Sequence, residues 1–277
     1  MVAQEVEVTA FVLHRRPYRE TSFLTTFFSA SEGKFTAVVK GVRPSQGRRR
    51  QTLQQKQAWL QPFQPLRLRW REKPETSSEL VTLRQFEPEP NTSCFQNFSH
   101  LWGEVHLCGL YMNELLYRLL YPRVAVEGVF DAYQAQLSAL ASLKQSPQVA
   151  DRQQMGWILR QFEFQLLLEL EGGVNLAEDI FQAKIEPHRH YWFYPNIGLV
   201  PKETLSDTLD AKFLTAQTTM QPPIEISGNC ILALRGWEFC TDCLPIWKKL
   251  FRKLLMLHLG NQPLMTPQLM RALYTKG

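Results

Sequence analysis

The sequence predicts an α+β protein in which a small β-barrel of five strands precedes a helical domain. Three observations support this fold class. Short stretches with period-two alternation fill the first 84 residues. A proline-rich segment, Glu87-Pro88-Glu89-Pro90-Asn91, follows them. Beyond it, Leu, Tyr and Met recur at helical spacing. We therefore expect two domains, residues 1–86 and residues 92–277.

Each predicted strand is short and bounded by turn residues, with Ser31-Glu32-Gly33-Lys34 as the first hairpin turn. In the fourth strand apolar residues alternate with arginine, which places Leu66, Leu68 and Trp70 inside and the guanidinium groups outside. Five short strands without a helical pattern between them are typical of a small closed barrel. The five strands are Ala10–Leu13, Thr21–Phe28, Phe35–Val39, Leu66–Arg71 and Glu79–Leu83.

The second domain is predicted to be helical with one irregular insert, at about 174–226. Gly172-Gly173 is a typical helix stop, Ser227 is a candidate N-cap, and Gly260 ends the penultimate helix. The predicted helices are 98–120, 126–143, 152–170, a basic helix at about 244–259, and a short one after Thr266.

Charge is segregated along the chain, although the net charge is only +5. Residues 1–84 carry a formal net charge of +8, residues 85–243 one of −9, and residues 244–277 one of +6. Basic segments of this kind attract polyanions. No stretch reaches 18 apolar residues and no signal peptide pattern opens the chain, which predicts a cytoplasmic protein. In that compartment the five cysteines are expected to be free thiols.

The N-terminal cations are candidates for nucleic-acid binding, because a barrel face with flanking loops presents cations at the spacing that phosphates need. Phe11, Tyr18 and Trp59 lie near them in sequence and could stack bases, or pack in the core. The alternative for the cations is a solvated basic surface, and for the three adjacent arginines a solvated loop. The candidate DNA-binding residues are Arg15, Arg16, Arg19, Lys40, Arg43, Arg48, Arg49, Arg50, Lys56, Arg67 and Arg69.

The basic helix at 244–259 is amphipathic and suits an acidic peptide with apolar anchors. The alternatives are a surface helix that packs its Leu face on the core, and a membrane-surface helix. Cys240-Thr241-Asp242-Cys243 and His188-Arg189-His190 supply potential metal ligands. Only one CxxC pair is present and it falls in a helix-like run, which favours buried packing over a metal site. The chain has no phosphate-binding loop and no zinc-protease motif, so we expect no enzymatic activity.

Several segments, in their order and spacing, resemble the bacterial RecO family of DNA repair proteins. The resemblance extends over nearly the whole chain. The segments are Ala10–Ser22, Lys40-Gly41-Val42-Arg43, Leu60-Gln61-Pro62-Phe63, Gly109–Leu116, Arg160–Glu163 with Leu166-Leu167 and Gly172–Asn175, and Leu259-Gly260 with Pro263-Leu264.

The resemblance implies an OB-fold followed by a helical domain, with binding of single- and double-stranded DNA and annealing of complementary strands. It implies contact with the acidic C-terminal tail of the single-strand-binding protein SSB, cooperation with RecR in loading RecA, and association with the nucleoid. We assign the SSB tail to the basic helix. The residues expected to bind it are Lys248, Lys249, Phe251, Arg252 and Lys253.

Some family members carry a four-cysteine zinc site just after the Gly-rich helix stop. Residues 174–201 of this chain contain no cysteine, which places it with the zinc-free members, and no cofactor is expected. A protein-interaction scaffold of the repair machinery, without intrinsic annealing, remains the alternative function.

Overall fold

The computed structural model describes residues 4–44, 50–72, 80–90, 96–143, 149–170, 175–195, 197–203, 222–260 and 262–274. The chain forms two compact units, one of residues 1–151 with 262–277 and one of residues 152–261. The predicted division into residues 1–86 and 92–277 stays a prediction. Among the described helices, none is both long and apolar enough to span a membrane.

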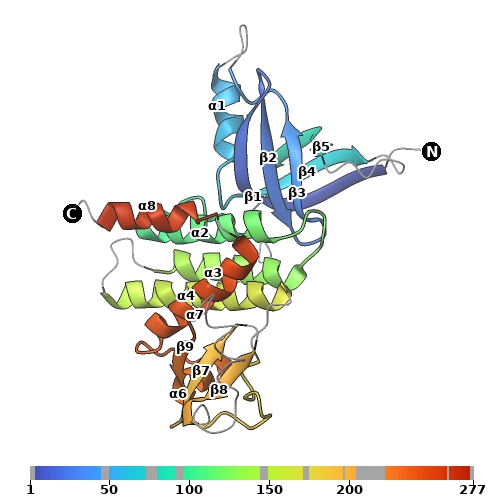
Figure 1. Ribbon diagram of the computed structural model, residues 1–277. Coiled ribbons are helices and arrows are strands. Elements are labelled where there is room, and N and C mark those ends of the chain that lie inside the picture. Colours follow the sequence, from blue (N-terminus) through green and yellow to red (C-terminus); the bar gives the residue numbers. More distant parts are fainter. Residues whose placement is uncertain are drawn as a thin grey trace. The chain divides into compact units, whose positions relative to one another are not determined.

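The first unit opens with a curled six-stranded sheet (Figure 1). Its spatial order is β5-β3-β2-β1-β4-β6, and all neighbours are antiparallel except β3 and β5. The predicted number of five strands was therefore wrong. The strands are β1 (Gln4–Tyr18), β2 (Ser22–Ser29), β3 (Gly33–Val39), β4 (Pro65–Glu72), β5 (Leu80–Thr82) and β6 (Gln85–Pro88).

The missed strand is β6, whose last two residues, Glu87 and Pro88, were predicted to belong to the proline-rich boundary. Its only partner in the sheet order is β4, so it is an edge strand. An edge strand tolerates a proline at its end, because that residue need not donate a hydrogen bond to a second neighbour. Helix α1 (Arg50–Trp59) also lies where no helix was predicted. Its residues are mostly polar, so the sequence shows no clear apolar stripe, although Leu53 is buried in the structure.

The two faces of the sheet bury different side chains, as period-two alternation requires. Ala10, Val12, Leu66, Leu68 and Trp70 lie on the inner side of the curled sheet in one buried cluster, which confirms the predicted inward set of β4. The opposite side of β1 and β2 packs against α3 (Glu127–Ala141). The ring centroids of Phe11 and Tyr133 are 5.4 Å apart and those of Phe28 and Phe130 are 5.3 Å apart.

Helix α2 (Gly103–Leu119) is attached to β1 by a buried polar group. The Asn113 amide donates to the carbonyl of Val12 at 3.1 Å and accepts from the Tyr133 hydroxyl at 2.6 Å. Burial raises the pKa of Tyr133, so its hydroxyl keeps the proton that it donates. Helix α8 (Met265–Tyr274) lies beside α2 (Figure 1), where Glu114 accepts from the Thr266 hydroxyl at 2.8 Å.

The second unit combines helices with a small sheet. Helix α4 (Val149–Glu169) leads into it, and the predicted irregular insert contains the three-stranded sheet β8-β7-β9. Its strands are β7 (His190–Tyr194), β8 (Gly198–Pro201) and β9 (Ile224–Ser227). Helix α6 (Gly228–Arg235) follows, and the Ser227 hydroxyl accepts from the Cys230 amide, which confirms the predicted N-cap. Helix α7 (Leu244–Leu259) has the predicted bounds.

Two of the five cysteines do not match the prediction of free thiols. Cys230 and Cys243 form a disulfide across 13 residues of sequence. Cys108 and Cys240 are free, and Cys94 lies outside the described residues. A cysteine count says only which pairings are allowed, whereas the packing of α6 against the start of α7 decides which sulfur atoms meet.

The Tyr133–Asn113 hydrogen bond yields the first prediction. Tyr133→Phe keeps the buried ring but leaves the Asn113 side-chain oxygen without the hydroxyl donor. An unsatisfied buried acceptor costs about 1–3 kcal/mol. We expect the free energy of unfolding, measured by urea titration, to fall by that amount. Tyr121→Phe is the matched control, because Tyr121 is 74% exposed. Equal stability of both variants would contradict the assignment.

Candidate nucleic-acid interface

Six of the predicted DNA-binding residues lie at one end of the curled sheet. In the register of the sheet Tyr18 faces Ser22 and Phe23 faces Val39, so the end of β1, the start of β2 and the end of β3 lie together. We call this group the basic end. Its members are Arg15, Arg16, Arg19, Lys40, Arg43 and Lys56.

Hydrogen bonds hold the loops of the basic end in place. The amides of Val42 and Arg43 donate to the Thr21 carbonyl at 2.9 and 3.1 Å, and the Arg43 guanidinium donates to the Arg19 carbonyl at 2.8 Å. Helix α1 is attached to the same loop, since the Gln57 amide donates to the Val42 carbonyl at 2.7 Å. The loop backbones are therefore ordered before any ligand arrives, which lowers the entropic cost of binding.

The cations of the basic end have different surroundings. Arg16, Arg19 and Lys40 are exposed, whereas Arg15 is half-buried. Arg15 donates to the Gln57 carbonyl at 3.2 Å and lies 5.3 Å from the centroid of the Phe23 ring, and burial lowers its pKa.

Within the described ranges, none of the six cations pairs with a carboxylate. The basic end therefore has an excess of positive charge that a polyanion would neutralise.

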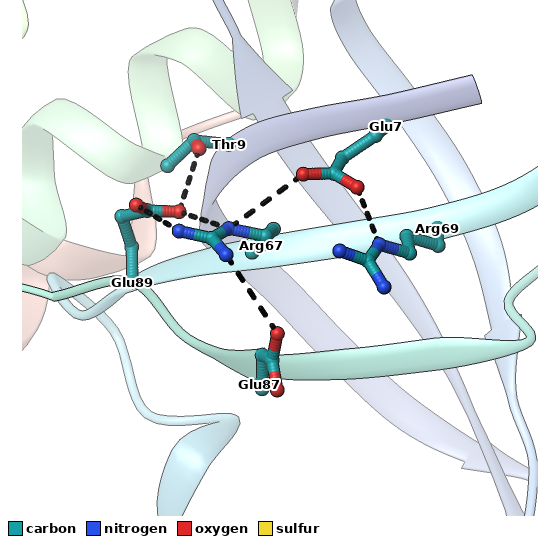
Figure 2. A network of polar contacts seen from close by, with 6 residues as sticks. All are labelled: Glu7, Thr9, Arg67, Arg69, Glu87 and Glu89. Atoms are coloured by element: carbon teal, nitrogen blue, oxygen red, sulfur yellow. Dashed lines mark hydrogen bonds and ion pairs between the residues drawn. The ribbon is translucent and has the colours of Figure 1, made fainter.

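Arg67 and Arg69 have a different environment, which Figure 2 shows. The Arg67 guanidinium donates to both carboxylate oxygens of Glu89, at 2.8 and 3.0 Å, and lies 3.7 Å from Glu7 and 4.0 Å from Glu87. Arg69 pairs with Glu7. We call these two arginines and three glutamates, with Thr9, the carboxylate network.

The carboxylate network follows from strand register. Glu7 faces Arg69 and Thr9 faces Arg67 between β1 and β4, and Arg67 faces Glu87 between β4 and β6. Three carboxylates against two guanidinium groups leave this patch slightly negative. Sequence reasoning found the arginines but missed their partners, because neither the long β1 nor the edge strand β6 was predicted.

The three remaining arginines of the candidate set are less well defined. Arg48 and Arg49 lie outside the described residues, and Arg50 is the first residue of α1. Of the three aromatic candidates, Phe11 is fully buried and cannot stack on a base. Trp59 packs partly buried against Phe86, and Tyr18 lies under the Arg19 guanidinium.

An exposed aromatic side chain that was not predicted as a candidate, Tyr117, lies beside His14 of β1 and Lys34 of β3. The ring of Tyr117, on α2, is 4.8 Å from that of His14, and the Lys34 ammonium donates to the Tyr117 carbonyl at 2.7 Å. Tyr117 is 40% exposed. Burial, and then the charge of Arg16, lower the pKa of His14, so this ring is neutral at pH 7. The contacts of α2 with His14 on β1 and Lys34 on β3 bring these residues together.

The predicted tail-binding residues divide between the two faces of α7. Lys248, Lys249 and Arg252 are exposed, and no carboxylate of the described residues pairs with them. Lys253 is half-buried, donates to the Pro222 carbonyl and has its pKa lowered by burial. Phe251 is fully buried and packs near Phe164.

Met256 and Leu257 are exposed beside these cations. The accessible surface of α7 is thus cationic with apolar residues at one end. Among the described residues, no group of three or more His, Cys, Asp or Glu side chains that could hold a metal ion is found.

Comparison with known proteins identifies relatives of this chain. The family model "Recombination protein O N terminal" matches residues 1–90. The chain is 34% identical to the DNA repair protein RecO of Alteromonas mediterranea over 95% of each chain, and 34% identical to that of Psychromonas ingrahamii over 96% of each. It is 32% identical to that of Pseudomonas paraeruginosa, over 94% of this chain and 92% of the relative.

The carboxylate network predicts a pH-dependent contribution to stability. The hydrogen bond from Arg67 is the largest influence on Glu89 and holds its pKa below the usual 4.5. A lowered pKa stabilises the fold above pH 4.5, and this stabilisation is lost as the pH falls through the folded-state pKa. We expect Glu89→Gln to lower the midpoint of thermal unfolding at pH 7, by an amount that shrinks towards pH 3.

Glu87→Gln is the control for this measurement, because Glu87 lies 4.0 Å from the Arg67 guanidinium and is more exposed than Glu89. Its effect should be small at every pH. A Glu89→Gln effect that is constant between pH 7 and pH 3 would show that the ion pair does not contribute to the stability of the sheet.

Proposed function

The chain belongs to the RecO family of DNA repair proteins, and from this premise we propose that it is a non-catalytic recombination mediator. It binds single- and double-stranded DNA, anneals complementary strands, and with RecR helps load RecA on single strands coated by SSB. The basic end of the sheet carries the proposal, because six cations without carboxylate partners among the described residues lie there, on the end of β1, on α1 and on loops held by hydrogen bonds.

The DNA backbone is proposed to cross the basic end. Arg16, Arg19 and Lys40 are exposed there and free to approach phosphates. Arg67 and Arg69 contribute less, because phosphates would have to displace Glu89 and Glu7 and then lie beside the displaced carboxylates. The exposed Tyr117 ring, flanked by Lys34, offers a surface on which a base can stack as the strand leaves β1.

Annealing follows from charge neutralisation. Two complementary strands repel each other through their phosphates, and cations along one strand reduce that repulsion while its bases stay accessible. Two of the three aromatic side chains proposed for stacking from sequence are engaged in protein packing. Contact mainly through the phosphates leaves the base edges available for pairing. This mode requires no chemical step and no cofactor.

The SSB tail is proposed to dock on α7. An acidic peptide with apolar residues needs cations for its carboxylates and an apolar contact for its side chains. The exposed Lys248, Lys249 and Arg252 supply the first, with Met256 beside them. Phe251 supports the helix from the buried face, and Lys253 becomes available only if it leaves the Pro222 carbonyl.

The role of the basic end is tested by charge reversal. The double variant Arg16→Glu and Arg19→Glu should weaken binding of a single-stranded oligonucleotide. It should also reduce the slope of log K against log salt by about one to two, since each lost phosphate contact contributes about 0.7. Fluorescence anisotropy over a salt series measures both quantities.

The matched control for that measurement is Arg69→Gln, which removes an arginine that is already paired with Glu7. It should leave the salt slope nearly unchanged. If the control lowers the slope as much as the double variant does, the strand crosses β4 and the proposed path is wrong.

Docking of the SSB tail is tested by reversing Lys248, Lys249 and Arg252 to Glu together. We expect loss of binding to intact SSB, and loss of annealing on SSB-coated strands, with annealing of naked strands retained. Arg235→Glu is the control, because it reverses an exposed cation at the end of α6 in the same unit. Binding that survives the triple reversal, or that persists with SSB lacking its tail, would place the docking site elsewhere.

A further inference from the structure

Three of the five cysteines meet at one point of the second unit. Cys230 lies in the first turn of α6, Cys243 occupies the N-cap position of α7, and Cys240 lies in the segment just before it. Cys230 and Cys243 form the disulfide, and the Cys240 sulfur lies 2.7 Å from the Cys243 sulfur. The central sulfur atom, that of Cys243, therefore has a covalent partner and a free thiol in reach at the same time.

The three sulfur atoms differ in access to solvent. Cys230 and Cys243 are 6% and 3% exposed, whereas Cys240 is partly exposed. A reagent from solution therefore reaches Cys240 first. The short CxxC spacing keeps Cys240 beside Cys243, which is bonded to the buried Cys230.

The backbone around the disulfide is fixed by hydrogen bonds. The Ser227 hydroxyl accepts from the Cys230 amide at 3.3 Å, and the buried Trp247 indole donates to the Cys230 carbonyl at 2.9 Å. The Cys243 carbonyl accepts from the amide of Trp247 at 2.9 Å, in the first turn of α7. Both ends of the disulfide are thus held in position while the bonding between the sulfurs changes.

We propose that Cys230, Cys240 and Cys243 form a thiol–disulfide exchange site for small-molecule disulfides and thiols. Cys240 is the surface thiol of this site, Cys243 is the sulfur through which bonds are passed, and Cys230 is the buried thiol that receives the final bond. The proposal does not rest on DNA or SSB binding.

The oxidation of the reduced protein proceeds by three exchange steps. The Cys240 thiolate attacks a small-molecule disulfide, which forms a mixed disulfide and releases one small thiol. The Cys243 thiolate displaces the second small thiol, giving a Cys240–Cys243 disulfide. The Cys230 thiolate then attacks Cys243, giving the Cys230–Cys243 disulfide and returning Cys240 as a thiol. Two protein thiols are oxidised and one small disulfide is reduced to two thiols, with the two thiol protons passing to the products.

The position of Cys243 at the N-terminus of a 16-residue helix favours this route. The partial positive charge of a helix N-terminus stabilises a thiolate, so Cys243 is a better attacking and leaving group than an ordinary cysteine. The reverse sequence lets a small thiol that enters at Cys240 reduce the buried disulfide.

The test uses the full-length chain with Cys94→Ser, incubated with oxidised glutathione, trapped by alkylation and mapped by mass spectrometry. The parent should form the Cys230–Cys243 disulfide. Cys230→Ser should accumulate the Cys240–Cys243 disulfide, and Cys243→Ser should accumulate glutathione on Cys240. Cys240→Ser should reach the same Cys230–Cys243 disulfide at least about tenfold more slowly, because only the buried sulfurs remain.

Cys108→Ser is the control and should oxidise at the parental rate, because Cys108 lies on α2 in the first unit. Oxidation of Cys240→Ser at the parental rate would remove Cys240 from the pathway. A parent protein with all three thiols still alkylated after treatment with excess oxidised glutathione would overturn the proposal. Each of the three site variants retains two of the three cysteines and the Cys108→Ser control retains all three. Circular dichroism verifies that each variant is folded before the rates are compared.

Discussion

The pairing of β1 along both of its edges is the constraint on which the first unit depends. Its first half pairs with β4, its second half pairs with β2, and the register shifts between Val12 and His14. Both faces of β1 also pack against other residues: Val12 belongs to the buried cluster inside the curled sheet, and Phe11 packs against α3. Ala10 and Phe11, which pair with both β2 and β4, are fully buried, so the middle of β1 has little freedom to move relative to the strands on either side.

The same strand separates two kinds of charge. In its first half, Glu7 and Thr9 face Arg69 and Arg67, so positive charge on β4 is neutralised within the protein. In its second half, Arg15 and Arg16 extend towards the loops, where no described carboxylate pairs with them. An excess of cations thus forms at one end of the sheet only. Counting arginines along the sequence cannot show this difference, because it depends on which strands are neighbours.

Several features of the fold were predictable because their signals are local. The Ser227 N-cap, the bounds of α7 and the inward residues of β4 each depend on a repeat or a cap within a few residues of sequence. The missed elements lack such signals. Helix α1 has little apolar periodicity, and β6 is a four-residue edge strand that ends in a proline. Both are stabilised by partners distant in sequence, such as the Val42 carbonyl for Gln57 and β4 for β6.

The candidate site shows the same division. The clustering of cations near predicted turns supported a basic surface in the first unit. Which of the candidate cations are paired with carboxylates can be seen only in the folded structure. Arg67 and Arg69 are cations on an outward strand face, as expected of DNA-binding residues. They are nevertheless paired with Glu89 and Glu7 in the carboxylate network. Conversely, Tyr117 had no signal of its own and becomes relevant only through His14 and Lys34. For a surface that binds phosphates, the informative quantity is therefore the charge left after internal pairing, and this quantity exists only once the strands are paired.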